Sequence, residues 1–217
     1  MTTHHTRRWP ASLAVIAVLV LQLKLPSGMT AGPAWLLPAC EAALLVPLVW
    51  ANPMHLRRDE PWLRYVAIVL VGFLIVVNGV NLGLLIDYLT EGADGASGRN
   101  LVQAALLIWV TNVVAFAIAY WEIDRGGAFA RLPDHPHPAD RPDLLFPQMA
   151  GGIEGWDAKT WVPSFTDYLF VSFTNATAFS PTDTMPLSAR MKIMMAVQAG
   201  IALLTLAVVA ARAVNVL

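Results

Sequence analysis

Charged residues are scarce in this sequence. Lysine, arginine, aspartate and glutamate together make up 13% of its 217 residues, about half the share that soluble domains carry. The two signs almost cancel, leaving a net charge of −1, so the chain lacks the basic surface that nucleic-acid binding needs. This composition excludes an ordinary soluble domain and argues against a nucleic-acid partner.

Cysteine and catalytic motifs are also nearly absent. Cys40 is the single cysteine and lies inside an apolar block, so no internal disulfide can form, and a buried structural thiol is expected. The sequence contains no HExxH motif, phosphate-binding loop or recognisable Ser-His-Asp pattern. We therefore expect no enzyme activity and no cofactor.

One group of side chains has metal-binding chemistry. It consists of Asp134, His135, His137 and Asp140. The prolines between these residues disfavour a shell of ligands that converges on one ion. No metal site is expected.

Long apolar blocks are what the sequence has in abundance. Hydrophobic residues make up 57% of the chain and gather in blocks of about twenty, the length a helix needs to cross a hydrocarbon core of roughly 30 Å. Backbone polar groups in a bilayer must bond within their own segment, so these blocks are predicted to be helices. The predicted spans are Trp9–Leu25, Pro33–Ala51, Trp62–Leu85, Leu101–Trp121 and Ile193–Val214.

The N-terminal block has two interpretations. Arg7 and Arg8 followed by an apolar run are also typical of a secretory signal peptide. However, Gln22 and Lys24 interrupt the run, and a second apolar block follows at once. We interpret Trp9–Leu25 as a short first membrane helix, with a cleaved signal as the alternative.

The chain divides into three predicted parts. Residues 1–121 form a four-helix transmembrane region, residues 122–163 a proline-rich loop, and residues 164–217 a half-helix and the last transmembrane helix. The proline-rich loop shows no helical or strand period. It is expected to lie over the membrane surface as an extended, partly disordered segment.

Polar side chains inside the predicted spans are few. Glu41 lies near the middle of the second span, where a carboxylate costs about 3 kcal/mol or more unless it faces protein or water. Asn78 and Asn81 share a face of the third span, and Asn112 on the fourth offers a further partner. Glu41 is either an ion or proton site or a protonated residue that hydrogen-bonds between helices, and the second role is commoner.

Gly79 and Gly83 form a GxxxG pair in the third span. Small residues at this spacing let two helix backbones approach closely. The pair predicts a packing face for another helix, and it indicates nothing about activity.

The segment before the last span is too polar to face lipid. Pro163–Ser180 has helical character but carries several Ser, Thr and Asn side chains, which suits a half-helix buried among other helices. Ser180–Asp183 then breaks the chain, and Arg190 and Lys192 mark a membrane surface. This pattern predicts a re-entrant half-helix, and a full span over Trp161–Ser180 is the alternative.

Residues 167–188 resemble the pore segment of two-helix potassium channels. The resemblance rests on Asp167–Phe173, followed by Thr177, Asp183, Pro186 and Ser188, which match without gaps. It implies a pore loop and a homo-oligomer, with a tetramer as the channel-like case.

The filter positions depart from those channels. Where the channels have Thr-Val-Gly-Tyr-Gly-Asp, Ala178–Asp183 reads Ala-Phe-Ser-Pro-Thr-Asp. The glycines that let successive carbonyls turn toward the ion are missing. Pro181 fixes φ and removes an amide at the tyrosine position. A potassium-selective filter is therefore not expected.

Over most of its length, the chain is similar to a family of uncharacterised bacterial multi-pass membrane proteins. Three segments carry this similarity: the basic loop His55–Glu60, Tyr120–Gly127 after the fourth span, and Tyr168–Asp183 before the last. It implies a location in the plasma membrane, the inner membrane of a bacterium. It brings no established activity.

Together these features predict an all-α integral membrane protein of about five helices plus a re-entrant half-helix. The leading hypothesis is channel-related permeation of ions or small solutes, without potassium selectivity. The candidate pore residues are Thr174, Asn175, Thr177, Ser180, Thr182 and Asp183.

The alternative is a non-conducting scaffold or partner subunit. In that case, Asp183 would cap a helix or pair with Arg190 or Lys192. The expected partners are the lipid bilayer, further copies of the chain and, in a pore, an inorganic ion.

Lysine and arginine predict the orientation through the positive-inside rule. One side carries Arg7, Arg8, Arg57, Arg58 and Arg64, and the short loops of the other carry only Lys24 and Arg99. The N-terminus and the proline-rich loop are therefore expected in the cytoplasm. This conflicts with potassium channels, whose pore loops enter from outside, and the conflict stays open at this point.

Cysteine labelling tests this orientation. In a Cys40→Ala background, cysteines introduced at Thr3, His55 and Asp140 should resist a membrane-impermeant thiol reagent in intact cells, because all three lie on the predicted cytoplasmic side. They should react after the membrane is permeabilised. Labelling at position 140 from outside would reverse the orientation and restore channel-like topology.

Overall fold

The computed structural model describes residues 9–23, 35, 39–40, 42–43, 46, 61–90, 98–128, 130–131, 141–151, 154, 157–158, 161–177 and 183–216. Its helices in this part of the chain are α1 (Trp9–Gln22), α3 (Pro61–Thr90), α4 (Gly98–Ile123), α5 (Phe165–Thr177) and α6 (Ala189–Val216). Most of the predicted second span, with Glu41, lies outside the described residues.

Three of these helices, α3, α4 and α6, are long and apolar enough to cross a membrane, and α1 is apolar but shorter. The prediction of a mostly helical chain with helices of membrane-spanning length and composition is confirmed, and it suggests a membrane protein. The long helices extend beyond the apolar blocks that predicted them. In particular, α6 begins at Ala189 and includes Arg190 and Lys192 in its first turn.

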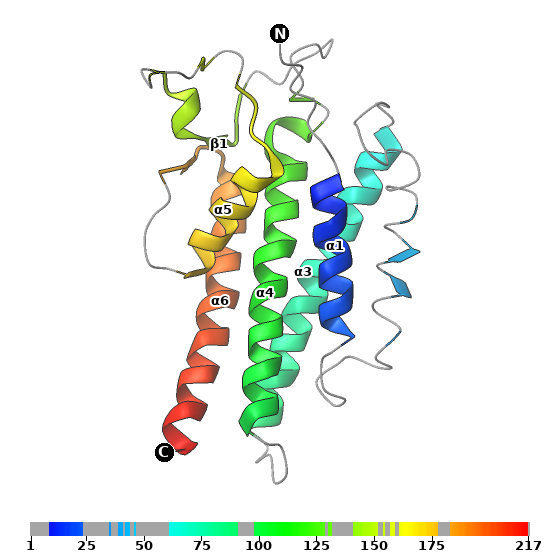
Figure 1. Cartoon of the computed structure of the whole chain (residues 1–217), viewed down its shortest axis with the longest axis vertical. Coiled ribbons are helices and arrows are strands. Elements are labelled where there is room, and N and C mark those ends of the chain that lie inside the picture. The colour runs from blue at the N-terminus through cyan, green and yellow to red at the C-terminus, as the bar shows by residue number, and fades with distance from the viewer. Residues whose placement is uncertain are drawn as a thin grey trace.

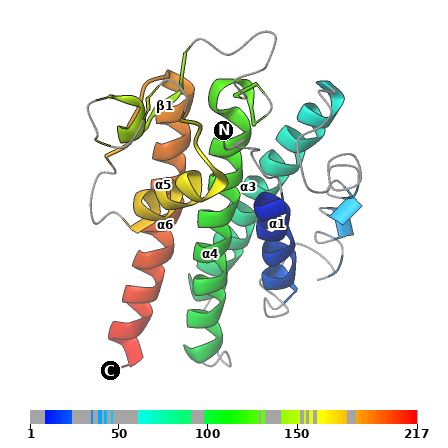
Figure 2. The ribbon, with the colours of Figure 1, turned by 45° about the horizontal axis from the view of Figure 1, so that its top comes forward.

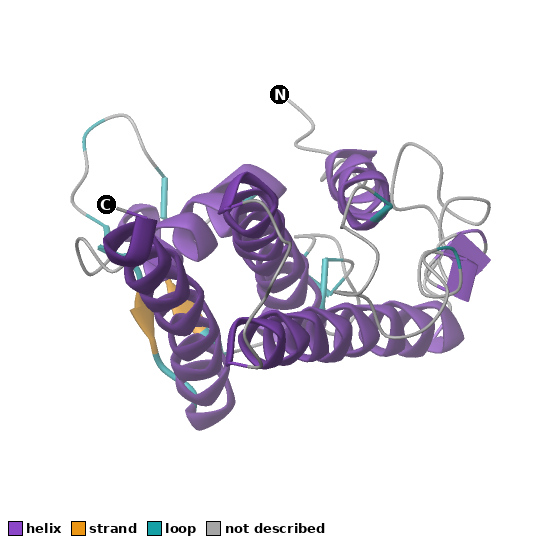
Figure 3. Cartoon of the chain, turned by 90° about the horizontal axis from the view of Figure 1, so that it is seen from below, coloured by secondary structure: helices purple, strands orange, loops and turns teal. Residues whose placement is uncertain are grey.

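Helix α4 is the centre of the bundle and contacts α1, α3, α5 and α6 (Figure 1). Helix α3 runs antiparallel to α4 and is tilted, so the two lie close at one end and diverge toward the other (Figure 1). Viewed from below, α3 lies strongly inclined to the other long helices (Figure 3). Helix α5 lies across α4 and α6 near one end of the bundle (Figure 2).

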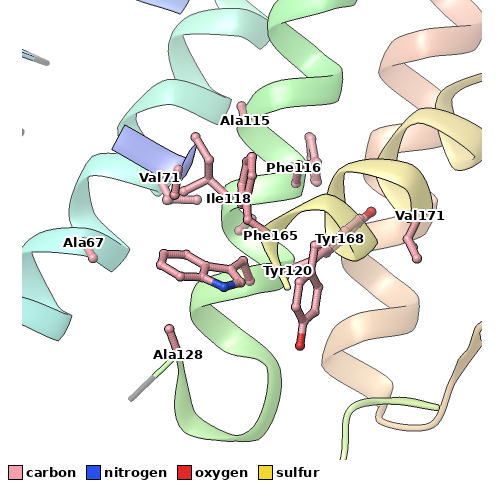
Figure 4. Packing of buried hydrophobic residues seen from close by; sticks show 14 of the residues in the cluster. Ala67, Val71, Ala115, Phe116, Ile118, Tyr120, Ala128, Phe165, Tyr168 and Val171 are labelled. Atoms are coloured by element: carbon pink, nitrogen blue, oxygen red, sulfur yellow. The ribbon is translucent and has the colours of Figure 1, made fainter. Parts of the chain in front are cut away.

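Small residues explain the central position of α4. Ala104, Ala115, Ala117 and Ala119 are fully buried, and side chains of this size let neighbouring helices approach closely. Around them pack larger side chains from α3, α4 and α5, including Val71, Phe116, Ile118, Phe165, Tyr168 and Val171 (Figure 4). A second apolar cluster joins α3, α4 and α6 near the other end.

Described parts of the proline-rich loop are folded against the end of the bundle. They contain two short 3-10 helices, η1 (Asp124–Gly126) and η2 (Pro147–Met149), and strand β1 (Leu144–Leu145). Strand β1 pairs antiparallel with β2 (Met185–Pro186), which precedes α6. The expectation of an extended, partly disordered loop is wrong for these residues, because Leu144 and Phe146 join the main apolar cluster.

Two expectations about packing are also wrong. Cys40 is exposed on the chain. A Cβ atom built on Gly79 or Gly83 would meet nothing within 4 Å, so this glycine pair packs against none of the helices that the structure describes. Helix α3 instead turns Leu74, Leu82 and Leu85 inward.

Candidate functional site

Gln198 in the middle of α6 is fully buried, and its side-chain amide joins three helices. Its Oε1 accepts hydrogen bonds from the Tyr120 hydroxyl of α4 (2.5 Å) and from Asn175 Nδ2 of α5 (2.8 Å). Its Nε2 donates to the Ser172 carbonyl (2.9 Å) and Oγ (2.6 Å) on α5. Both the oxygen and the nitrogen of this amide are thus hydrogen-bonded within the protein.

Further side chains extend this network to backbone carbonyls of α4 and α6. Asn112 Nδ2 donates to the Gln198 carbonyl (3.2 Å), Ser172 Oγ to the Val113 carbonyl (2.6 Å) and Asn175 Nδ2 to the Met195 carbonyl (2.9 Å). The predicted site residues Asn112 and Asn175 therefore meet at one place. The signal for Gln198 was its polarity inside an apolar span.

Local hydrogen bonds shape α5 itself. Ser164 precedes the helix, and both its amide and its hydroxyl donate to Asp167 Oδ2 at 2.7 Å. This Ser-x-x-Asp pairing satisfies free donors at the helix start. Near the end, Thr174 Oγ1 donates to the Phe170 carbonyl (2.9 Å) and Thr177 Oγ1 to the Thr174 carbonyl (3.0 Å).

The six predicted pore residues therefore differ in their surroundings. Asn175 bonds to α6, whereas Thr174 and Thr177 bond within α5. Ser180 and Thr182 lie outside the described residues, and Asp183 is exposed. Arg190, a proposed partner of Asp183, binds Asp143 instead.

A second polar layer lies between α3 and α4 and is not satisfied. Among the described residues, Asn78 Oδ1 and Nδ2, Asn81 Oδ1, Thr111 Oγ1 and Asn112 Oδ1 are buried without a hydrogen-bond partner. This layer separates the two apolar clusters of the bundle. Leu74 and Ala115 belong to the cluster on one side, and Leu82 and Ile108 belong to the cluster on the other. Each such atom costs about 1–3 kcal/mol, so this layer weakens the contact between α3 and α4.

Asp124 organises the end of the bundle. Its Oδ1 accepts the backbone amides of Asp143 (2.7 Å) and Leu144 (3.2 Å), and its Oδ2 accepts the Tyr168 hydroxyl (2.6 Å). The Asp124 carbonyl accepts Arg131 Nη1 (2.7 Å). One buried residue thus fastens the loop to both α4 and α5.

Backbone geometry brings Asp124 into this position. Arg125, Gly126 and Gly127 have φ values of 50°, 79° and 104°, a region that glycine adopts without steric cost. A Cβ on Gly127 would lie 3.1 Å from the Glu122 carbonyl oxygen. The chain therefore needs glycine where it turns sharply after α4.

Asp143 forms the second anchor of the loop. Arg190 of α6 binds its carboxylate with two nitrogens, with Nε 2.8 Å from Oδ1. The Arg125 amide donates to Asp143 Oδ2 (3.1 Å), and the Leu187 amide donates to the Asp143 carbonyl (2.8 Å). The loop is thereby fixed to the start of α6 as well.

Neither Asp124 nor Asp143 was singled out as a site residue. The hydrogen bond between Asp124 and Tyr168 joins residues that are 44 positions apart in the sequence. No known protein family, curated protein or solved structure matches this chain. The role of the site therefore rests on its geometry.

The two polar layers predict opposite effects of the same change. Gln198→Leu should lower the unfolding free energy by about 2 kcal/mol or more, because it leaves buried partners on α4 and α5 unpaired. Asn78→Leu should raise it by about 1–2 kcal/mol, because it removes an amide that has no partner. Denaturant unfolding in detergent, followed by tryptophan fluorescence, measures both. Equal destabilisation by the two variants would contradict the assignment of Asn78 as unpaired.

Asp143 predicts a dependence of stability on pH. Burial opposes its ionisation, but hydrogen bonds from Arg190, Ser188 and the Arg125 amide outweigh burial and hold the pKa below its ordinary value of 3.8. The stabilisation is therefore complete above about pH 4–5 and is lost as the pH falls through the lower folded-state pKa.

Asp143→Asn should reduce stability at pH 7 by about 1–3 kcal/mol and give a flatter profile at acidic pH. Melting of the detergent-solubilised protein between pH 3 and 7 measures this. Glu154→Gln, an exposed carboxylate in the same loop, is the matched control and should follow the wild type. A profile for Asp143→Asn as steep as that of the wild type would refute the assignment.

Proposed function

We propose that this chain is a channel-related membrane protein whose homo-oligomer lets ions or small solutes pass, without potassium selectivity. The observation that carries the proposal is the path of the chain around α5. Phe165 at its start packs edge-on against Trp121 of α4, and Trp109 Nε1 donates to the Ala176 carbonyl at its end (3.4 Å). Helix α5 therefore runs obliquely beside this part of α4, and its 13 residues can descend by at most roughly 18 Å.

The chain then returns to the end from which α5 started. The Leu187 amide and the Arg190 side chain both bind Asp143, whose own amide binds Asp124 at the end of α4. A descent of at most roughly 18 Å is too short to cross a hydrocarbon core of about 30 Å. This path supports a re-entrant half-helix over a full span.

Polar contacts at depth also support a re-entrant segment. Non-spanning backbone is tolerated inside a bilayer only where protein or water surrounds it. Gln198 Nε2 donates to Ser172 Oγ, and Asn175 Nδ2 donates to Gln198 Oε1, so one face of the lower half of α5 lies against α6. Trp109 satisfies a carbonyl of its last turn.

Exposed apolar surface supports assembly into an oligomer. Only 17% of the most apolar stretch of α6 is buried inside the chain, against 61% of the corresponding stretch of α4. Other exposed apolar side chains add to this surface of α6, namely Phe170 and Phe173 on α5 and Val197 on α6 itself. Copies that meet along this surface would bring their segments after Thr177 around a common axis, with a tetramer as the channel-like arrangement.

One observation favours the alternative, a non-conducting scaffold or partner subunit. The hydroxyls and amides of Thr174, Asn175 and Thr177 are engaged within the chain. They are therefore poor candidates for lining a wet pathway. Among the described candidates, this leaves Asp183, an exposed carboxylate, as the residue expected to face a permeation pathway.

Flux through the purified protein in liposomes tests permeation. The wild type should pass small cations, and Asp183→Asn should reduce the flux by about threefold or more, because a carboxylate on the pathway concentrates cations. Glu154→Gln removes an exposed carboxylate elsewhere and should leave the flux unchanged. If no small ion crosses above the rate of protein-free vesicles, across several lipids and pH values, the scaffold alternative holds.

A further inference from the structure

A groove of about 200 Å³ lies between α3 and α6, over the surface of α4. Its α3 wall includes Ile68, Gly72 and Ile75, and its other walls include Ala119 of α4 and Met194 of α6. The lining is almost entirely apolar. It lies in the part of the bundle where the tilt of α3 carries it away from α4 (Figure 1).

Depth in the membrane limits what can occupy this groove. Trp62 and Tyr65 at the start of α3 are 48% and 71% exposed, and exposed aromatics of this kind gather at the membrane–water interface. The groove begins at Ile68, about one turn deeper, and continues to Ile75. Water needs polar partners, which an apolar groove does not offer, so the hydrocarbon of a lipid is the natural occupant.

Cationic side chains lie at the interfacial end of the groove. Arg64 is one turn above Ile68 on α3, and its guanidinium lies beside η1, within 4 Å of the positions that Cβ atoms on Gly126 and Gly127 would occupy. Arg190 is one turn above Met194 on α6, and its side chain is 55% exposed although it binds Asp143. Arg190 is engaged by Asp143, whereas Arg64 lies between the exposed aromatics Trp62 and Tyr65, which places it where a lipid phosphate would lie.

One carboxylate also lines the groove at this end. Glu122 belongs to its wall, but the residue is buried, at 5% exposure, and has interactions of its own within the protein. Glu122 Oε2 and Arg64 Nε lie equally far, 3.8 Å, from the position that a Cβ on Gly127 would occupy, so the carboxylate is a neighbour of Arg64. Of the two residues, Arg64 is the exposed one and is accessible to a headgroup.

We propose that this groove binds one acyl chain of an anionic phospholipid, whose phosphate is held by Arg64. Apolar contacts along Ile68–Ile75 retain the chain, and the guanidinium of Arg64 selects for a negative headgroup. This proposal is independent of permeation, since a scaffold subunit with the same groove would bind the same lipid.

Filling the groove is the first test. A Cβ on Gly72 would meet nothing within 4 Å, so Gly72→Phe inserts a ring into the groove without a backbone clash. Gly83 on the same helix is equally open but lies outside the groove, so Gly83→Phe is the matched control. Gly72→Leu serves if the phenylalanine variant fails to fold.

Native mass spectrometry of the detergent-solubilised protein, titrated with phosphatidylglycerol or with phosphatidylcholine of the same chains, measures binding. The wild type should prefer phosphatidylglycerol. Gly72→Phe should lose that binding about tenfold, and Gly83→Phe should keep it. Arg64→Gln should abolish the preference between the two lipids while retaining a bound chain. Arg99→Gln, which removes an exposed arginine from the first turn of α4, should change neither.

Three results would overturn the proposal. Equal lipid loss in Gly72→Phe and Gly83→Phe would mean that the lipids form a nonspecific belt. A wild type without preference between the headgroups would remove the role of Arg64. Loss of an oligomer, rather than of lipid, in Gly72→Phe would assign the groove to a second copy of the chain.

Discussion

The amide of Gln198 is the interaction on which the rest of this bundle depends. Burial of apolar surface gives helices little reason to associate inside lipid, because lipid tails are as apolar as the side chains. Hydrogen bonds from one amide to α4 and α5 supply that reason. Helix α5 depends on them most, because its polar residues have no place in contact with lipid.

The end of the bundle depends in turn on two aspartates. Asp124 binds the loop to α4 and α5, and Asp143 binds it to α6. Because the loop is fixed at both residues, its described parts lie against the bundle although their composition predicts a loose segment. The helices and the loop thus form one connected unit.

The helices were predictable from the sequence because length and apolarity are local properties. Which face of each helix is buried could not be predicted, as Cys40 and the Gly79–Gly83 pair illustrate. The rotation of a helix about its axis is set by its neighbours, which the local sequence does not reveal. The two aspartate anchors were missed for a related reason. Asp124 and Tyr168 are 44 residues apart, and Asp143 and Arg190 are 47 apart, and no short motif connects them. Asn112 was singled out because a polar residue in a span needs a partner, whereas Asn175 was singled out as a candidate for lining a pore.

The position of Gln198 after α5 in the chain also determines when α5 can complete its hydrogen bonds. Synthesis runs from the N-terminus, so α5 leaves the ribosome before the residue that satisfies Ser172 and Asn175 exists. Until α6 follows, the amide that binds Ser172 and Asn175 is missing. The packing of α5 against α4 can therefore be completed only after the residues of α6 have been made.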